Sequence, residues 1–272
     1  MRDPSQYYSA QGLVQIDFDF YNPQESDYLA TKNLLNQLFQ SDAQLIGVEG
    51  LAELIVDQTQ IGTTVKTDSQ ESDPYAFVTV VNLDAHKENS SVSKLRSYLS
   101  SKCPQLASIL AQPPSGGHTG WVFSERLINM PPQVVPPMFR MLAEELQRLV
   151  AEGEPYAFDR LVFVSRTFVP TQELEANWVA MTRAIESGKR LKDKWPQQQM
   201  AGRNVLPYHI EDEIIQQHAS VTTHYSFTQP RDGDRTSESL GVEQAGCIMI
   251  MPTSKLPAFV EQMNRDLAPP GV

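Results

Sequence analysis

The residues best suited to chemistry are histidines and carboxylates, and one group of them stands close together in the chain. His209 is followed by Glu211, Asp212 and Glu213, and imidazole and carboxylate groups are metal ligands. On a helix, however, Glu211 and Glu213 point to different faces. We therefore expect these carboxylates to stabilise the positive end of a helix and to face solvent rather than to bind a metal.

Other candidate catalytic groups lack the sequence context that their chemistry requires. None of the five histidines lies in an H-E-x-x-H pair, the motif of zinc hydrolases. Cys103 and Cys247 are 144 positions apart, form no C-x-x-C pair, and have no histidine beside them in sequence. Ser124 is in a predicted strand without the G-x-S-x-G turn of hydrolases. The sequence therefore predicts no catalytic residue and no metal site.

The glycine-rich segment at residues 115–120, SGGHTG, is a candidate phosphate-binding loop. Such loops bind phosphate when they follow a strand and open a helix, where free main-chain N–H groups point at the ligand. Here the loop precedes a predicted strand, so we interpret it as a turn.

The elements that would position these residues follow from periodicity. Residues 12–20 alternate between apolar and polar, as a half-buried strand does, and Met138, Leu142, Leu146 and Leu149 recur at helical spacing. Further strands are predicted at 61–66, 75–83, 120–128, 157–169, 221–228 and 246–251, the last two as a hairpin. Further helices are predicted at 26–39, around 51–55, and at 90–111 with a break at Pro104, 137–151, 211–219 and 254–267; we expect 188–204 to be mobile.

This order predicts one α/β domain over residues 1–272, with a central mixed, largely antiparallel sheet flanked by helices. Two helices after the first strand, and a later strand-helix-strand-helix-hairpin run, match the layout of the GNAT acyltransferase fold. A shared fold does not establish shared chemistry.

The turn after the fourth predicted long strand bears on that chemistry. In GNAT enzymes this turn supplies main-chain N–H groups to the pyrophosphate of acyl-coenzyme A. Here the turn is NMPPQVV at 129–135, followed by Pro136 and Pro137. Proline has no N–H to donate, whereas it suits the first turn of a helix. We therefore expect the usual coenzyme cradle to be absent; an acyltransferase would need donors elsewhere.

The charge of the chain is concentrated near its start. Lys and Arg number 22 against 33 Asp and Glu, a net charge of −11. Residues 1–75 carry 12 acidic and three basic residues, or −9, and the other 197 residues carry −2. This balance argues against direct nucleic-acid binding and favours a basic partner. The densest acidic segment is a predicted loop at 68–74 that holds Asp68, Glu71 and Asp73. It is either a solvated loop or a docking surface for a basic protein.

A short basic run, KRLKDK at 189–194, is the opposite feature, with Trp195 after it. It is either a nuclear import signal or a solvated helix end, and Trp195 is a second candidate partner-binding residue. Two cysteines suit a reducing compartment. The polar first twelve residues lack a signal-peptide core, and no apolar run reaches the length of a membrane span. We expect a nuclear or cytosolic protein without membrane insertion.

One long segment resembles a known family. Residues 124–133 read SERLINMPPQ, followed by Pro136, Pro137 and Met138, and this run resembles the signature of the BCCIP family. Other segments agree in order: VQIDFDFYNP, DYLATKNLLNQLF, IGTTVK, FVTVVNL, YHIEDEIIQQHA and MIMPTSKL. The matching signature residues, to which we assign a structural role, are Ser124, Glu125, Arg126, Asn129, Pro131, Pro132 and Gln133.

The resemblance implies a GNAT-like fold in a family not known for enzymatic activity, with no cofactor. It implies a nuclear protein that shuttles to the cytoplasm. As in fungal members, it would escort a basic large-subunit ribosomal protein and support nuclear export of clients, including a phosphatidylinositol-phosphate kinase, with the export machinery. The animal branch instead implies a cell-cycle and DNA-repair scaffold that binds a cyclin-dependent-kinase inhibitor and a breast-cancer susceptibility protein. A residual acyltransferase is a third possibility.

Overall fold

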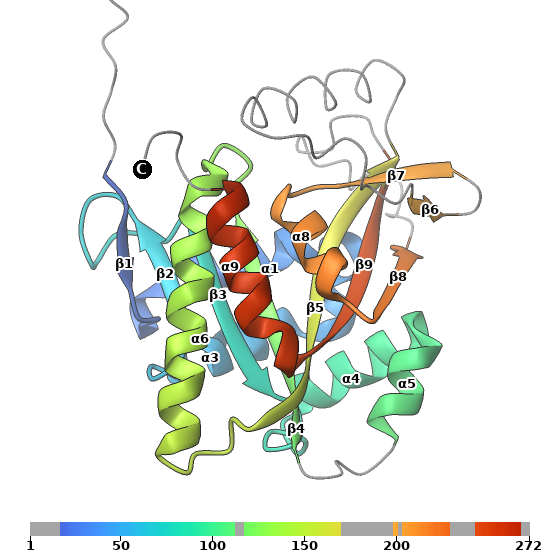
Figure 1. Ribbon diagram of the computed structural model, residues 1–272, viewed down its shortest axis with the longest axis horizontal. Coiled ribbons are helices and arrows are strands. Elements are labelled where there is room, and N and C mark those ends of the chain that lie inside the picture. The colour runs from blue at the N-terminus through green and yellow to red at the C-terminus, as the bar shows by residue number, and fades with distance from the viewer. Residues whose placement is uncertain (1–16, 112–116, 170–197, 201–202, 229–242, 268–272) are drawn as a thin grey trace, which may run out of the picture.

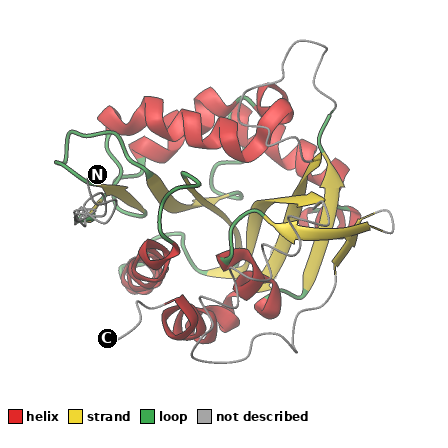
Figure 2. Ribbon diagram, turned by 90° about the horizontal axis from the view of Figure 1, so that it is seen from above, coloured by secondary structure: helices red, strands yellow, loops and turns green. Residues whose placement is uncertain are grey.

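In the computed structural model, a sheet whose strands alternate apolar residues lies between two layers of helices (Figures 1 and 2). The structure describes residues 17–111, 117–169, 198–200, 203–228 and 243–267. The strands are β1 (Asp19–Tyr21), β2 (Thr63–Lys66), β3 (Ala76–Asn82), β4 (His118–Arg126), β5 (Phe158–Val169), β6 (Gln198–Met200), β7 (Arg203–Pro207), β8 (Val221–Ser226) and β9 (Glu243–Pro252). The helices are α1 (Tyr28–Phe39), α2 (Ala43–Ile46), α3 (Val48–Asp57), α4 (Ser90–Lys102), α5 (Pro104–Leu110), α6 (Val135–Ala151), α8 (Glu211–His218) and α9 (Leu256–Leu267).

The strands form one mixed sheet. Its order is β1-β2-β3-β4-β5-β7-β6, and β9 pairs with both β5 and β8. Among the described strands, β4 and β5 are parallel and the other neighbours are antiparallel. This arrangement confirms the predicted α/β class with a mixed, largely antiparallel sheet, and it agrees with the GNAT-like layout.

Each face of the sheet has its own hydrophobic core because successive strand residues point to opposite sides. Val78 and Val80 pack on the side of α6, α8 and α9. Phe77 and Val81 pack on the side of α1 to α5. Burying one such side chain contributes about 1.5–3 kcal/mol, so both helical layers are needed to cover the sheet.

Helix α6 shows how a predicted pattern leads to packing. Its residues Met138, Leu142, Leu146 and Leu149 are buried, as predicted. Glu145, which the pattern assigns to solvent, is instead half-buried and accepts a 2.8 Å hydrogen bond from the N–H of Gly62. Burial raises the pKa of Glu145.

Strands β4 and β5 diverge, and this divergence shapes the site described below. Their parallel pairing ends at Val122 and Phe163. Beyond that point β7 takes the same edge of β5, with Thr167 opposite Pro207. The C-terminal ends of β4 and β5 are therefore joined by side-chain contacts and by residues 208–211 rather than by main-chain pairing.

Two expectations about segments need correction or qualification. Residues 198–200 and 203–207 form β6 and β7, which the sequence pattern did not predict. Residues 188–197 and 201–202 lie outside the described residues, and the mobility expected of 188–204 stays a prediction. β1 begins at Asp19. Of the earlier part of the predicted first strand, residues 17–18 are not in a strand, and residues 12–16 lie outside the described residues. None of the helices in the described part of the chain is long and apolar enough to cross a membrane.

Candidate functional site

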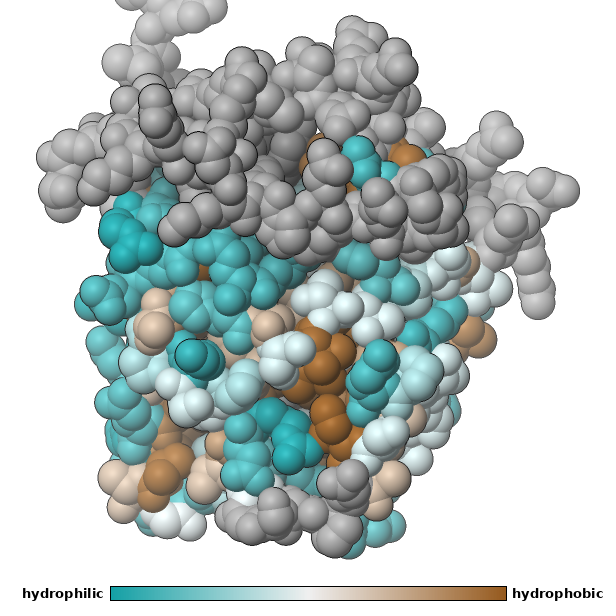
Figure 3. All heavy atoms as spheres, turned by 45° about the vertical axis from the view of Figure 1, so that its right-hand side comes forward, coloured by the Kyte–Doolittle hydropathy of each residue, from teal (hydrophilic) through white to brown (hydrophobic). Residues whose placement is uncertain are grey.

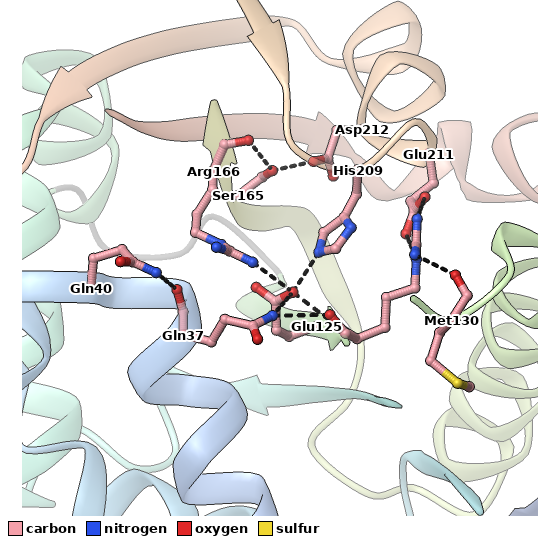
Figure 4. Close-up of polar contacts among 10 residues, drawn as sticks. Gln37, Gln40, Glu125, Met130, Ser165, Arg166, His209, Glu211 and Asp212 are labelled. Carbon is pink, nitrogen blue, oxygen red and sulfur yellow. Dashed lines mark hydrogen bonds and ion pairs between the residues drawn. The ribbon is translucent and has the colours of Figure 1, made fainter. Parts of the chain in front are cut away.

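A buried set of polar side chains fills the divergence of β4 and β5 (Figure 4). At its centre is Glu125 of β4, of which 2% is exposed. Its Oε1 atom lies 2.5 Å from Nε2 of His209, 3.1 Å from Nε2 of Gln37 on α1, and 3.3 Å from Nη2 of Arg166 on β5. The main-chain N–H of Arg126 also donates to this oxygen, at 3.1 Å. One carboxylate oxygen therefore joins four separate parts of the chain.

Opposing effects act on the pKa of Glu125. Burial raises it, but the positive charge of Arg166 and the contact with His209 outweigh burial and hold it at about 2. The group is therefore ionised at neutral pH. Because this pKa lies below the ordinary value of 4.5, Glu125 contributes stability that is lost as the pH falls from about 4.5 towards 2.

Arg126 forms a second buried contact, on the other face of β4. Its Nε and Nη2 atoms donate to the two carboxylate oxygens of Glu211, at 2.7 and 3.0 Å, and its Nη1 atom donates to the carbonyl of Met130 at 2.7 Å. Burial raises the pKa of Glu211, but Arg126 outweighs this and the net shift is downward. This forked pair ties α8 to the loop that follows β4.

β5 contributes two further members. The guanidinium carbon of Arg166 lies 3.7 Å from the ring centre of Tyr208, close enough for a cation–π contact. Ser165, the preceding residue, donates from Oγ to Oδ2 of Asp212. Burial raises the pKa of Asp212 to about 7, and its carboxylate neighbour Glu211 adds to the effect.

The interpretation of residues 209–213 as a solvated helix start is therefore wrong. Glu211, Asp212 and Glu213 are all buried. Periodicity misplaces them because α8 packs against both α9 and β9. Its first turn also contacts Arg126 of β4 and Ser165 of β5, so more than one face of this turn is covered. Arg126 and Arg166, two arginines inside apolar strands, are a sequence signal that could have indicated buried acidic partners, but it was not used.

The chemistry that this cluster can perform is limited by its own contacts. The Oγ atom of Ser165 donates to a carboxylate rather than to a histidine, so it lacks the serine–histidine pair of the hydrolase triad. Cys103 and Cys247 are both buried, and burial raises the pKa of the Cys247 thiol, which disfavours the reactive thiolate. Among the residues that the structure describes, His, Cys, Asp and Glu form no group of three that could hold a metal.

The proline turn after β4 has few main-chain donors. Of the seven residues at 131–137, four are proline and have no N–H. The N–H groups of Val134 and Val135 donate within the turn, to the carbonyls of Pro131 and Pro132. The first turn of α6 therefore offers a phosphate little of what a helix N-terminus usually presents.

Some of the family-signature residues are buried in this cluster, and the others lie beside it, in β4 and in the turn that follows. Glu125 and Arg126 are buried, Ser124 is half-buried, and Asn129 is exposed at the start of the turn. The other three, Pro131, Pro132 and Gln133, are half-buried. The signature thus contains two buried ionic residues and the turn that follows them.

The predicted acidic surface lies at another edge of the sheet, in the loop between β2 and β3. Asp68, Glu71 and Asp73 are all exposed there. The loop is anchored from below by Lys66, whose Nζ atom lies 2.6 Å from Oδ1 of Asp27 and 2.5 Å from the carbonyl oxygen of Gln70. A fully buried ion pair therefore fixes the main chain that presents the acidic side chains.

More acidic residues lie near this loop. Asp17, Asp19 and Glu25 are exposed, and Asp19 is paired in register with Lys66, two residues before Asp68. Trp195, the other candidate partner-binding residue, lies outside the described residues.

The face that carries α4, α5 and β8 is less uniformly polar than the acidic loop. Apolar residues there form a small central group among polar ones (Figure 3).

Comparisons with known proteins agree with one another. The family model described as BCCIP matches residues 13–215. Protein bcp1 of Emericella nidulans is 35% identical over 94% of this chain and 89% of its own length. Protein bcp1 of Schizosaccharomyces pombe is 35% identical over 88% of this chain and 85% of its own. The crystal structure of BCP1 from Saccharomyces cerevisiae superposes with a TM-score of 0.64 at 24% identity, covering 96% of this chain and 93% of that one.

Proposed function

The chain belongs to the BCCIP family, and from this premise we propose that it is a non-enzymatic chaperone and adaptor that binds a basic ribosomal protein of the large subunit. The feature that supports this proposal best is the acidic loop carrying Asp68, Glu71 and Asp73, held in place by buried Lys66. An acidic surface of this kind would neutralise a basic client that otherwise binds RNA or aggregates.

Wider roles follow from the same premise. We propose that the protein acts in the nucleus, shuttles to the cytoplasm with the nuclear export machinery, and supports export of a phosphatidylinositol-phosphate kinase. A net charge of −11 suits a binding partner of basic proteins rather than of nucleic acid. The signature cluster at Glu125 and Arg126 would support the fold instead of contacting the client, because both side chains are buried.

Neutralising the acidic loop is expected to weaken client binding roughly tenfold or more at low salt, because exposed charges contribute modestly one by one and more as a group. The variant is Asp68→Asn/Glu71→Gln/Asp73→Asn. Binding of purified basic large-subunit ribosomal proteins would be measured by calorimetry at low and high salt. The difference between variant and wild type should shrink at high salt, where exposed charges are screened.

A matched control removes three exposed acidic charges elsewhere: Glu144→Gln on α6, Glu154→Gln after it, and Glu261→Gln on α9. It should bind the client as the wild type does. Equal weakening by both variants would show that net charge acts rather than the loop. Failure of the wild type to bind or solubilise any basic large-subunit ribosomal protein, with capture of a kinase inhibitor instead, would favour the scaffold function.

The proline turn leads to a separate prediction about coenzyme binding. Because four of the seven residues at 131–137 lack an N–H, we expect no heat of binding when acetyl-coenzyme A is titrated to about 1 mM. Micromolar affinity would contradict the non-enzymatic proposal. A Pro131→Gly/Pro132→Gly variant would then show whether the turn or another part of the chain holds the coenzyme.

A further inference from the structure

Ile128, in the turn that follows β4, is an exposed isoleucine that the fold does not explain. The N–H of Met130 donates to the carbonyl of Leu127 at 3.0 Å, so Ile128 takes a central position of a turn. Glycine, proline, asparagine, aspartate and serine favour such positions. The exposed fraction of Ile128 is 59%, and the other large apolar residues exposed within the described part of the chain are Leu29, Leu45 and Val150.

The main chain around Ile128 is fixed from both sides. Nη1 of Arg126 donates to the carbonyl of Met130 at 2.7 Å, and Nε2 of Gln37 on α1 donates to the carbonyl of Arg126 at 3.0 Å. Arg126 is itself held by its forked pair with Glu211. The turn is therefore ordered before any partner arrives, and a partner that contacts Ile128 has little main-chain entropy to overcome.

The pairing of β3 with β4 brings this turn beside the acidic loop. The N–H of Leu127 donates to the carbonyl of Tyr75 at 2.9 Å, and Tyr75 stands two positions after Asp73. Neighbouring strands are about 4.8 Å apart and a chain advances by at most about 3.6 Å per residue, so Ile128 lies within about 16 Å of Asp73. About five extended residues of a partner span this distance.

Ile128 has apolar neighbours, which distinguishes it from a single exposed residue of the ordinary kind. Tyr75 and Leu127 are only partly buried against the core on the side of α6. The acidic loop beside them has no Lys or Arg at residues 67–75, and Lys66, just before it, is buried against Asp27. The surface therefore combines an apolar contact with negative charge.

We propose that Ile128 is the apolar anchor of the docking surface whose charged part is the acidic loop. The segment that it binds is basic and carries an aliphatic side chain within about five residues of its lysines or arginines. Charge complementarity identifies this occupant, because the exposed carboxylates of the loop attract cations. The inference rests on the proposed function, which it extends from the charge of the client to the composition of the bound segment.

The two parts of this surface act differently on binding. Exposed charges speed the encounter and lose strength in salt, whereas an apolar contact surrounded by polar ones holds the complex together. An acidic loop alone accepts any polycation. The contact with Ile128 adds a preference for segments that carry an apolar side chain, and this preference can be measured directly.

Two synthetic peptides test the preference on the full chain. Each has nine residues, with four lysines separated by glycines, and either leucine or serine at its centre, so that the charge is equal. By calorimetry, the wild type should bind the leucine peptide about tenfold more tightly, or by about 1.4 kcal/mol, because leucine loses contact with water against Ile128. Ile128→Ser should abolish the preference without changing the affinity for the serine peptide, and Ile128→Leu should keep it.

Val150→Ser is the matched control, because Val150 is also exposed, at 45%. It lies near the end of α6, whose 17 residues extend over about 25 Å, so it is remote from the turn that precedes this helix. This variant should keep the tenfold preference, and urea unfolding of both serine variants should coincide with that of the wild type. Added salt should weaken binding of both peptides and leave their ratio unchanged.

Equal binding of the two peptides by the wild type, or a preference that survives Ile128→Ser, would overturn the inference. Purified basic large-subunit ribosomal proteins tell this failure apart from failure of the proposed function. If they bind the wild type and Ile128→Ser equally, the anchor is wrong and the proposed function stands. If none of them binds while the leucine preference is intact, the proposed client is wrong and the docking surface stands.

Discussion

Replacing Glu125 by glutamine is expected to lower the free energy of unfolding by about 3–5 kcal/mol, because the change leaves Arg166 buried without its anionic partner. Of the side chain of Arg166, 2% is exposed, so water cannot replace the lost partner. Glutamine has nearly the same shape as glutamate, and the loss therefore reports charge rather than a cavity. Urea unfolding at pH 7, monitored by tryptophan fluorescence, measures it.

A second substitution separates charge pairing from other effects. Glu125→Gln/Arg166→Met removes both charges and should recover part of the loss, because an apolar pair avoids the desolvation of two ions. The non-additivity of the double-mutant cycle gives the coupling. Ser124→Ala, at the half-buried neighbouring position, should stay within about 0.5 kcal/mol of the wild type. A loss below about 1 kcal/mol for Glu125→Gln would show that the cluster is already hydrated.

Glu125 and Arg166 also show what could be predicted from the sequence. Alternation correctly indicates the inward faces of β4 and β5: Phe123 and Val164 both lie in the core beside α1 to α5. Two positions further along each strand, the same face carries Glu125 and Arg166. Periodicity predicts that these residues are inside, but it cannot predict that two strands 41 positions apart in the chain bring opposite charges together.

The hardest feature to predict was the role of α8. The helix itself was predicted correctly at 211–219, against Glu211–His218 observed. Its acidic first turn is typical of an exposed helix start. Tertiary packing buries these acidic residues, against the interpretation from the pattern. β4 and β5 separate after Val122 and Phe163, and the carboxylates of α8 enter the space where the arginines lie. A divergence of paired strands leaves no mark in the local pattern of either strand.

The acidic loop presents the opposite case, because its exposure was predictable and its support was not. Asp68, Glu71 and Asp73 are hydrophilic and stand in a turn-rich segment, so an exposed loop follows from composition. Lys66 ends β2, where a lysine normally reaches solvent. Its complete burial depends on Asp27, 39 positions earlier in the chain. The residue that shapes the candidate binding surface is therefore not one of the residues on it.

Replacing Lys66 by methionine is expected to lower the free energy of unfolding by about 3–5 kcal/mol, because buried Asp27 loses its counter-charge. The two side chains are 0% and 1% exposed and their charged atoms lie 2.6 Å apart. The change also removes the hydrogen bond to the carbonyl of Gln70, so the main chain of the acidic loop loses its anchor. Thermal and urea unfolding measure the first effect, and hydrogen exchange at residues 67–74 measures the second.

The two effects can be separated with a partner substitution and a surface control. Lys66→Met/Asp27→Leu should regain much of the stability by removing both charges, but it cannot restore the bond to Gln70. If anchoring organises the surface, the double variant should be folded yet bind a basic client more weakly than the wild type, although Asp68, Glu71 and Asp73 are intact. Lys32→Met, which breaks the exposed 3.1 Å pair with Glu49, should have a far smaller effect. A stable double variant with wild-type affinity would show that the acidic side chains act without the anchor, and that Lys66 serves the fold alone.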